Sequence, residues 1–546
     1  MFPYRLMTAA SFAGAYLVSS GRIPRWPSFG FMSAFTALWI FQLILWALWA
    51  VILYPKLFSP LRGLPEPTGN SWFMGQFKTI RKLPTGVPMI EWINSIPNNG
   101  LIRYLGPFNQ ERLFVTSPKA LAEVLVTKNY DFVKPEQIRY TLGRILGIGI
   151  LLAEGDEHKM QRKNLLPAFA FRHIKDMYPV FWDKAREGVQ AMTKQVLRDV
   201  EKNPNPENTA VIEAGGWASR ITLDIIGLAG LGRDFDAIKN PNNTLTAAYA
   251  RVFKPSRQAQ VLQLLTMFLP PKLVSLLPFK RNEDIGTAAA MIRATCAELI
   301  TEKKQKLARK ELSDRDILSV AIESGGFTDS NLVDQLMTFL AAGHETTAAA
   351  MTWAAYLLAK HPIIQSRLRA EIRENLPSPT TKLDASISST AIDHLPYLNA
   401  VCNEVLRYLA PVPLTLRRAA CDTSIAGQFV PKGTQVMLIP WAINKSEALW
   451  GADAREFDPE RWMPRSDDAE KDKRAASGGA ESNFAYMTFL HGPRSCIGQA
   501  FAKAEFACLL AAWVGRFEMG LENEEERDES KIEVKGVTAR PGRGCF

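Results

Sequence analysis

The chain has 546 residues, 47% of them hydrophobic and 22% charged, a composition that supports a large core and argues against a disordered or fibrous protein. Its net charge of +10 suits a nucleic acid, an anionic membrane surface or an acidic protein, and the absence of a nucleic-acid-binding motif argues against the first. The six cysteines are scattered without a C-x-x-C pair, which argues against a disulfide framework or a structural zinc site and fits a reducing compartment.

The first long element is an apolar run of 26 residues, Phe29 to Tyr54, that contains no charged residue and no histidine. As a helix it would span about 39 Å, enough to cross a bilayer core of about 30 Å. Its length and late start argue against a cleaved signal peptide, and its unbroken apolarity argues against a buried core helix. We therefore predict an N-terminal segment, 1–28, followed by a transmembrane anchor, 29–54. The shorter run Met7–Ser19 fits an interfacial helix, a re-entrant segment or a second span.

The segment 55–70 contains four prolines, each of which fixes its own φ angle, so we predict a semi-rigid hinge there. Five basic residues follow the anchor within about thirty residues and three precede it, a bias that favours a cytosolic location for the rest of the chain. The remainder, 71–546, shows no internal repeat and no domain boundary, so we predict one domain. Two N-x-S/T triplets, at Asn242 and Asn444, are expected to stay unmodified in the cytosol.

Helical patterns dominate this domain, and three short runs are typical of strands. These runs are Leu113–Thr116, Ser424–Val430 and Gln435–Ile439. The predicted fold class is therefore mostly α with small β-sheets. The block 465–482 is charged and then rich in Ala, Gly and Ser, so we predict a surface insertion.

A helix is predicted to begin at Gly155. His158 and Arg162 are four residues apart, so they share one face of this helix. A second, long helix is predicted over Asp329–His361 from apolar residues at helical spacing.

The centre of the long helix reads Ala-Gly-His-Glu-Thr-Thr, residues 342–347. A glycine inside a helix costs about 1 kcal/mol relative to alanine, and we interpret Gly343 as opening space in a groove. The hydroxyl of Thr346 is expected to bond the carbonyl four residues earlier. A threonine face that only bonds its own backbone is the alternative, and His344 is expected to face away from the groove.

An E-x-x-R pair, Glu404 and Arg407, lies one helical turn apart. Alone, this spacing also fits an exposed ion pair. Further on, the stretch Phe489 to Gly498 has the pattern F-x-x-G-x-R-x-C-x-G. It places Cys496 between two glycines, with Arg494 two residues before the cysteine and a helical run behind it. Glycines allow a close backbone approach, and amide groups in such a turn tune a metal-bound thiolate.

This cysteine stretch resembles the heme-binding loop of cytochrome P450 enzymes, and the 342–347 stretch resembles the A-G-x-[DE]-T-T pattern of the same family. The resemblance covers nearly everything after the anchor and is closest to membrane-bound fungal members involved in secondary metabolism. It implies the cytochrome P450 fold and heme b, with Cys496 as the axial thiolate that favours O–O cleavage.

The resemblance also implies roles for other residues. Glu345 and Thr346 would deliver protons, and Glu404, Arg407 and Arg461 would form a buried structural cluster. The implied heme contacts besides Cys496 are Phe489, Arg494, Arg162, His158 and Arg417. Histidine stands at position 158 where the family often has tryptophan. An imidazole N–H can still donate, and the alternatives are a propionate bond that is lost or one that is pH-sensitive. Arg418 is the alternative to Arg417.

The implied function is insertion of one oxygen atom from O₂ into a lipophilic substrate. The residues 132–152 and 411–415 match substrate-facing regions, and Leu142–Leu152 is apolar. Only 50 residues follow Cys496 (546 − 496), too few for a flavin domain. The implied partners are NADPH–cytochrome P450 reductase and cytochrome b5 at the endoplasmic reticulum membrane, with Lys159, Lys163 and Lys503 meeting an acidic partner. The alternatives are a peroxide isomerase or dehydratase of the same fold and a non-enzymatic heme sensor.

Overall fold

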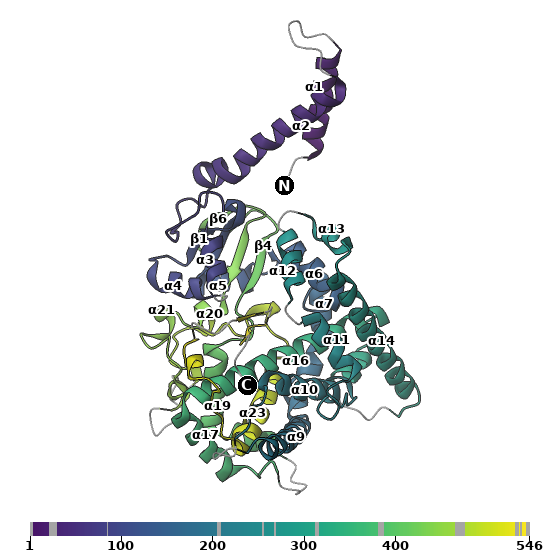
Figure 1. Cartoon of the computed structure of the whole chain (residues 1–546), viewed down its shortest axis with the longest axis vertical. Coiled ribbons are helices and arrows are strands. Elements are labelled where there is room, and N and C mark those ends of the chain that lie inside the picture. The colour runs from purple at the N-terminus through teal and green to yellow at the C-terminus, as the bar shows by residue number, and fades with distance from the viewer. Residues whose placement is uncertain are drawn as a thin grey trace.

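The computed structural model describes residues 4–20, 30–83, 86–204, 209–253, 256–266, 269–311, 316–380, 387–464, 476–529, 534–535 and 538–541. Helices make up most of the body, and a small sheet lies at the end of the body nearest the N-terminal helices (Figure 1). Helices α9, α17 and α23 lie at the opposite end. This mostly α architecture confirms the predicted fold class.

The helices fall into an N-terminal group and the groups that build the body. Their bounds are α1 Tyr4–Ser19, α2 Phe31–Ala47, η1 Leu48–Phe58, α3 Phe77–Lys82, α4 Val87–Ser95, η2 Pro107–Asn109, α5 Pro118–Ala122, η3 Glu123–Thr127, α6 Glu136–Leu146, α7 Gly155–Leu165, η4 Leu166–Phe169, α8 Phe171–Lys175, α9 Tyr178–Lys202, α10 Ala214–Ile225, η5 Ile226–Gly230, α11 Thr244–Phe253, α12 Arg257–Leu265, α13 Pro271–Leu276 and α14 Lys280–Ala308. The later helices are α15 Ile317–Glu323, α16 Asp329–Lys360, α17 Pro362–Asn375, α18 Ser389–Asp393, α19 Pro396–Tyr408, α20 Pro440–Ile443, α21 Glu447–Trp450, η6 Pro459–Trp462, η7 Asn483–Ala485, η8 Gly492–Arg494, α23 Gln499–Arg516 and η9 Glu524–Arg527.

The strands form one five-stranded sheet in the order β1-β2-β7-β4-β3 and two hairpins. Their bounds are β1 Leu101–Leu105, β2 Glu111–Val115, β3 Phe132–Val133, β4 Thr415–Ala419, β5 Thr423–Ile425, β6 Gln428–Val430, β7 Gln435–Leu438, β8 Val534–Lys535 and β9 Arg540–Pro541. The predicted runs Leu113–Thr116 and Gln435–Ile439 are confirmed as β2 and β7. The run Ser424–Val430 was predicted as one strand, but it forms two, β5 and β6, which pair as an antiparallel hairpin. Part of the predicted insertion, 465–475, lies outside the described residues.

Helix α16 forms the centre of the body and is buried over most of its length. Its N-cap is Thr328, whose hydroxyl accepts a hydrogen bond from the Asn331 backbone N–H at 3.3 Å. It ends at Lys360, one residue before the predicted end. Because α16 packs against α10, α14 and α23, it links the cysteine-loop side of the body to the opposite wall.

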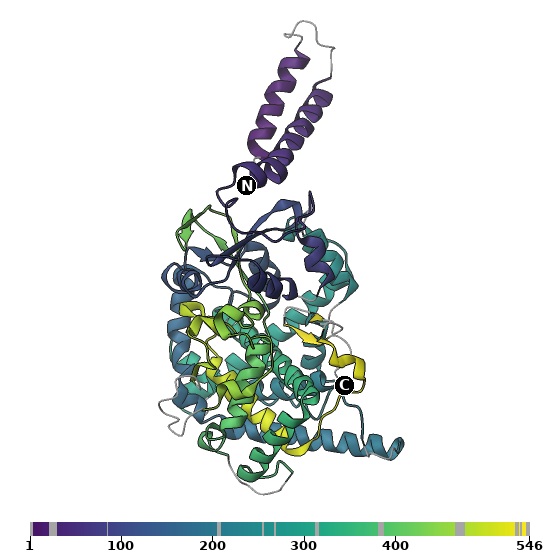
Figure 2. The same cartoon turned by 90° about the vertical axis from the view of Figure 1, so that its left-hand side faces the viewer.

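The predicted anchor is a continuous helix made of α2 and η1, Phe31–Phe58, which is long and apolar enough to cross a membrane. Figure 2 shows it running away from the body, with α1 at its side. It continues four residues beyond the predicted end at Tyr54, through Pro55.

The hinge region 55–70 is bonded to the body at several points. The segment η1 is π-helical, and Pro55 within it has no N–H to donate. The side-chain amide of Asn109 donates to the Val51 carbonyl at 2.9 Å, and the buried Arg103 donates to the Pro55 carbonyl at 2.5 Å. The Arg103 backbone N–H also donates to the Pro65 carbonyl at 2.9 Å. These bonds make the connection between anchor and body stiffer than its prolines alone would.

Candidate active site

The cysteine loop is shaped by its own backbone hydrogen bonds. The Cys496 N–H donates to the Phe489 carbonyl at 2.9 Å, and the Ser495 N–H donates to the Gly492 carbonyl at 3.0 Å. Gly492 has a φ of 75°, and a Cβ there would lie 2.1 Å from the Leu125 carbonyl oxygen. No other residue fits this position without moving the backbone of η3, which explains the glycine.

The thiol of Cys496 is deep in the protein yet reachable by solvent. Burial raises its pKa, while a hydrogen bond from the Gly498 backbone and the charge of Arg162 lower it. Because protein surrounds the Cys496 thiol on most sides and its side chain is still accessible, we infer that the thiol lines an internal cavity. Helix α23 begins directly behind it, so amide and guanidinium groups are in place to stabilise a thiolate.

A cluster of buried cations lies beside the loop. Arg494 is 9% exposed and forms an ion pair with Glu154, and its guanidinium stacks on the Tyr130 ring with 4.8 Å to the centroid. Burial, with the charge of Arg494 second, lowers the pKa of Arg417 to about 10. Burial and the charge of Arg417 lower the pKa of Lys134 to about 7. Several cations therefore share Glu154 as their nearby anion.

The two predicted contacts on α7 have protein partners. His158 is buried, and its Nδ1 lies 3.2 Å from the Tyr130 hydroxyl. Burial, followed by the charge of Arg494, lowers the pKa of His158 to about 4, so the imidazole is neutral at cytosolic pH. Arg162 donates to Ser495 through both terminal nitrogens, at 2.8 Å to the carbonyl and 3.2 Å to the hydroxyl. Its observed role is to brace the cysteine loop.

Strand β4 separates the two arginines that the sequence left as alternatives. Side chains alternate along a strand, so Arg417 points inward and is 3% exposed, whereas Arg418 is exposed. Arg417 donates to the Leu416 carbonyl at 2.9 Å and to the Thr415 hydroxyl at 3.1 Å. Of the two, only Arg417 reaches the side of the strand where the cation cluster lies.

The chemistry of this cluster fits the two carboxylates of a heme. Among the described residues, Arg494 Nε is buried without a hydrogen-bond partner, and an arginine of this kind suits a carboxylate. The described residues contain no group of three or more His, Cys, Asp or Glu that could hold a metal ion.

Near the centre of α16, one side of a single helical turn is accessible. Ala342 is exposed in the middle of this otherwise buried helix, and Thr346 one turn later is half-buried. The Thr346 hydroxyl donates to the Ala342 carbonyl at 2.8 Å, which confirms the predicted bond. Glu345 is buried, with Oε1 3.3 Å from Nε2 of His344, and His344 packs against the Tyr249 ring. His344 is thus a packed residue, as expected.

The interpretation of Gly343 as the opening of a groove is wrong. A Cβ at this position would lie 2.9 Å from both Cγ1 and Cδ1 of Ile226. The glycine is therefore explained by the close approach of η5 to α16. The open position on the helix is at Ala342 instead.

The E-x-x-R pair belongs to a fully buried cluster. Arg407 donates to both oxygens of Glu404, at 2.8 and 2.7 Å, and Arg461 donates to Glu404 Oε1 at 3.1 Å. Arg407 also donates to the carbonyls of Asn444 and Ala454, at 2.6 and 2.7 Å. The predicted structural cluster is confirmed, and the buried position of Asn444 leaves that triplet inaccessible to modification.

A buried acid that sequence analysis missed lies on α23. Glu505 is 0% exposed, and neither carboxyl oxygen has a well-formed hydrogen bond within the described part of the chain, although the Thr347 hydroxyl of α16 lies beside it. Burial raises its pKa well above the usual 4.5, and the contact with Thr347 lowers it. Glu505 therefore lies between the helix behind Cys496 and the helix that holds Thr346.

We expect Glu505→Gln to stabilise the protein increasingly as pH rises. The pKa of Glu505 is raised in the folded state, so its contribution to the free energy of unfolding is complete only below the unfolded pKa of about 4.5. As the pH rises above this value, the wild type loses up to about 1.4 kcal/mol of stability per pH unit. The amide has nearly the same shape and does not titrate. Melting temperatures of both proteins at pH 6 and pH 8 test this, with the exposed Glu522→Gln as control. An equal difference at both pH values would contradict it.

Glu154, Lys134 and Tyr130 were also missed. Glu154 directly precedes α7, and Lys134 and Tyr130 flank the two-residue strand β3, so no periodic pattern marks them. The only available signal was their position near residues 132–152, which the sequence assigns to the substrate side.

The fold and this site define a protein of the heme-thiolate class. The cytochrome P450 family model matches residues 65–544. The cytochrome P450 monooxygenase FUM15 of Gibberella moniliformis is 47% identical over 529 residues, covering 90% of this chain and 88% of the relative. The monooxygenase sphH of Aspergillus fumigatus is 47% identical over 503 residues, with 91% and 90% coverage. ALT8 of Alternaria alternata is 44% identical over 548 residues, with 92% of each covered.

The chain belongs to the cytochrome P450 family. It is an enzyme, a cytochrome P450 monooxygenase, and its resemblance to fungal members is confirmed. Membership implies a heme-thiolate cofactor and a redox partner, and the apolar helix Phe31–Phe58 is consistent with a membrane anchor.

Proposed function

We propose that this enzyme hydroxylates or epoxidises a lipophilic secondary metabolite at the cytosolic face of the endoplasmic reticulum membrane. The observation that supports this most is the joint presence of Cys496 on its glycine loop and the cation cluster beside it. Heme b bound there would supply activation of O₂ and transfer of one oxygen atom to the substrate.

The protein's own residues hold the cofactor and move protons. Cys496 would bind the iron, with Phe489 supplying the loop carbonyl that fixes the cysteine backbone. Arg494 and Arg417 would bind the propionates, with neutral His158 as a further donor. Arg162 keeps the loop in place through Ser495 and would reach a propionate only by exchanging one of these bonds.

Glu345 and Thr346 are proposed to deliver protons from α16. Glu345 is buried beside His344, and Thr346 lies at the open turn marked by Ala342. A carboxyl group and a hydroxyl on adjacent residues can pass a proton toward the reacting oxygen. In a peroxide isomerase no such delivery is needed, so this pair favours the monooxygenase over that alternative.

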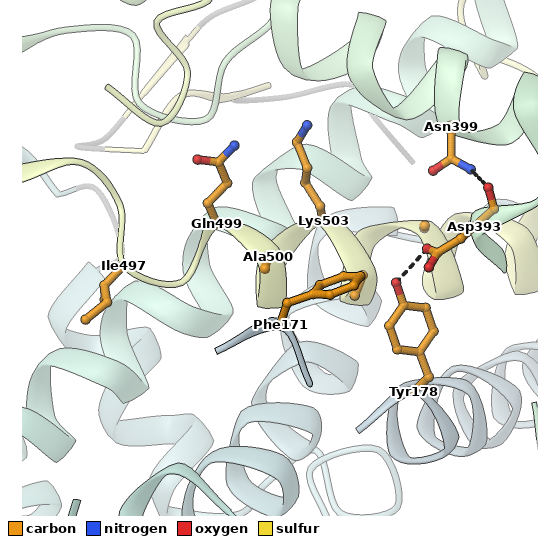
Figure 3. Close-up of a pocket in the computed structure, with 10 residues that line it drawn as sticks. Phe171, Tyr178, Asp393, Asn399, Ile497, Gln499, Ala500 and Lys503 are labelled. Carbon is orange, nitrogen blue, oxygen red and sulfur yellow. Dashed lines mark hydrogen bonds between the residues drawn. The ribbon is translucent and has the colours of Figure 1, made fainter. Parts of the chain in front are cut away.

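An NADPH-dependent reductase is proposed to bind the surface next to the Cys496 loop and the start of α23, with cytochrome b5 as a second electron donor. A hollow of about 470 Å³ lies at the first turns of α23, lined by Gln499, Lys503, Phe171 and neighbouring residues. Figure 3 shows Gln499 and Lys503 projecting to the same side of α23, with Phe171 and Tyr178 approaching from α8 and α9. A concave surface with a basic side chain suits an acidic loop of a partner.

We expect Lys163→Glu to raise the reductase concentration needed for half-maximal turnover about fivefold, the equivalent of about 1 kcal/mol. Lys163 is exposed on α7, whereas Lys503 is half-buried and burial lowers its pKa, so Lys163 is the better probe. The measurement is NADPH oxidation against reductase concentration at two salt concentrations. Lys432→Glu, in the loop after β6 at the other end of the body, is the control. Unchanged turnover and unchanged salt dependence in Lys163→Glu would rule out docking at this residue.

The function itself is tested with membranes that contain the enzyme and its reductase, incubated with candidate lipophilic extracts and ¹⁸O₂. We expect a product that contains one ¹⁸O atom and forms only with NADPH. Product formation without O₂ and NADPH would instead support the peroxide isomerase. Tight heme binding without turnover of any extract would support the sensor.

A further inference from the structure

The N-terminal helices α1 and α2 lie side by side, away from the body (Figure 2). The face of α1 that meets α2 consists of Met7, Ser11 and Ala15, which are four residues apart and at most 5% exposed. Gly14 adds a close approach, because a Cβ there would lie 2.7 Å from Leu38 Cδ1. Small residues of this kind let two membrane helices approach closely.

Two polar contacts join the helices. The Gln42 side-chain amide donates to the Ser11 hydroxyl at 3.0 Å, and the Trp39 indole N–H donates to the Thr8 hydroxyl at 3.4 Å. Gln42 carries the single side-chain amide of the apolar run Phe29–Tyr54. An amide left without a partner in hydrocarbon costs several kcal/mol, so its pairing with a completely buried serine indicates a specific contact.

These contacts fix the depth of α1. Gln42 lies 11 residues after Phe31 and 16 before Phe58 (42 − 31 and 58 − 42), which is near the middle of the span. If this helix crosses the bilayer, Ser11 lies at mid-bilayer depth with it. An interfacial position for α1 would separate Ser11 from Gln42.

We propose that α1 inserts beside α2 as the first helix of a membrane hairpin, so that the N-terminus and the catalytic domain lie on the same side of the membrane. The proposal rests on the membrane anchorage given under the proposed function and adds a second inserted helix to it. The side chains that point outward from the hairpin would contact the acyl chains of the lipid bilayer.

The exposed side of α1 has the chemistry that lipid requires. Leu6, Phe12 and Tyr16 are 75, 58 and 53% exposed. The helix has 16 residues and spans about 24 Å, shorter than the hydrocarbon core of about 30 Å. Arg5 at its first turn can extend to the interface, which relieves such a mismatch.

The distribution of basic residues favours the hairpin. With a single span, three basic residues precede the anchor on the far side and five follow it. The hairpin moves Arg5 to the cytosolic side, so the count becomes two against six. The two are Arg22 and Arg25, and the six are Arg5, Lys56, Arg62, Lys78, Arg81 and Lys82. A stronger positive bias on the cytosolic side is the normal arrangement.

The test uses the full-length chain in sealed microsomes and two reporters. One variant carries an N-terminal extension with an epitope and an N-glycosylation acceptor, and the other carries the same acceptor inserted after Ser20. We expect the Ser20 variant to be glycosylated. The N-terminal variant is expected to remain unglycosylated, and protease added outside the vesicles should remove its epitope.

Glycosylation of the N-terminal acceptor, or protection of its epitope, would overturn the hairpin while leaving a single anchor intact. Failure of the Ser20 acceptor to be glycosylated would overturn both the hairpin and the proposed anchor. The chain without an inserted acceptor is the control, because its exposed triplet at Asn242 stays unmodified if the catalytic domain is cytosolic.

Discussion

Replacing Cys496 with serine is expected to abolish the long-wavelength Soret band of the reduced, carbon monoxide-bound protein. A neutral hydroxyl cannot replace the charge that a thiolate donates to iron. Loss of groups that only support a metal ligand costs about 10–100-fold in metal affinity or activity, so loss of the ligand itself should cost more than about 100-fold in turnover. Absorbance spectra of reduced membranes with carbon monoxide, together with heme content, provide the measurement.

Cys421→Ser is the matched control for this substitution. Cys421 is also a free, exposed cysteine, but it lies just after strand β4 and outside the cysteine loop. The same chemical change there should leave both the spectrum and the heme content unchanged. An unaltered Soret band in Cys496→Ser would show that another residue binds the iron.

Much of the fold could be predicted because its signals are local. The apolar repeat of α16 and the unbroken apolarity of Phe29–Tyr54 set these two helices to within a few residues. Strands β1, β3 and β4 were not predicted, because they depend on partners far away in the chain. Strand β4, for example, pairs with β7 and β3, and β3 is only two residues long.

The site residues likewise divide into those that local motifs predict and those that depend on contacts between distant segments. The cysteine loop and the Glu404 cluster follow from motifs, whereas Lys134, Glu154 and Glu505 become visible only when separate segments meet. The error at Gly343 has a similar cause, since a glycine in a helix indicates close approach but cannot reveal that Ile226 of η5 is the neighbour. The bracing of the loop by Arg162 likewise depends on Ser495, which is 333 residues away in the chain.

The ion cluster of Glu404 predicts the largest loss of stability. Arg407→Leu would remove both hydrogen bonds that Arg407 donates to Glu404 and would leave the carbonyls of Asn444 and Ala454 without this donor. Breaking a buried ion pair by removing one partner costs about 3–5 kcal/mol, because the remaining charge stays buried. We therefore expect a lower denaturation midpoint and loss of heme at growth temperature.

The pair Arg367–Glu460 offers a control with the same residue types. Both side chains are about half exposed, so Arg367→Leu should change stability by less than about 1 kcal/mol. Urea unfolding of the detergent-solubilised proteins, followed by circular dichroism and heme absorbance, measures both variants. Equal effects of the two substitutions would contradict a structural role for the cluster. A large effect of Arg407→Leu alone would show that burial of the ion pair, and not its charge, makes it essential to the fold around the heme.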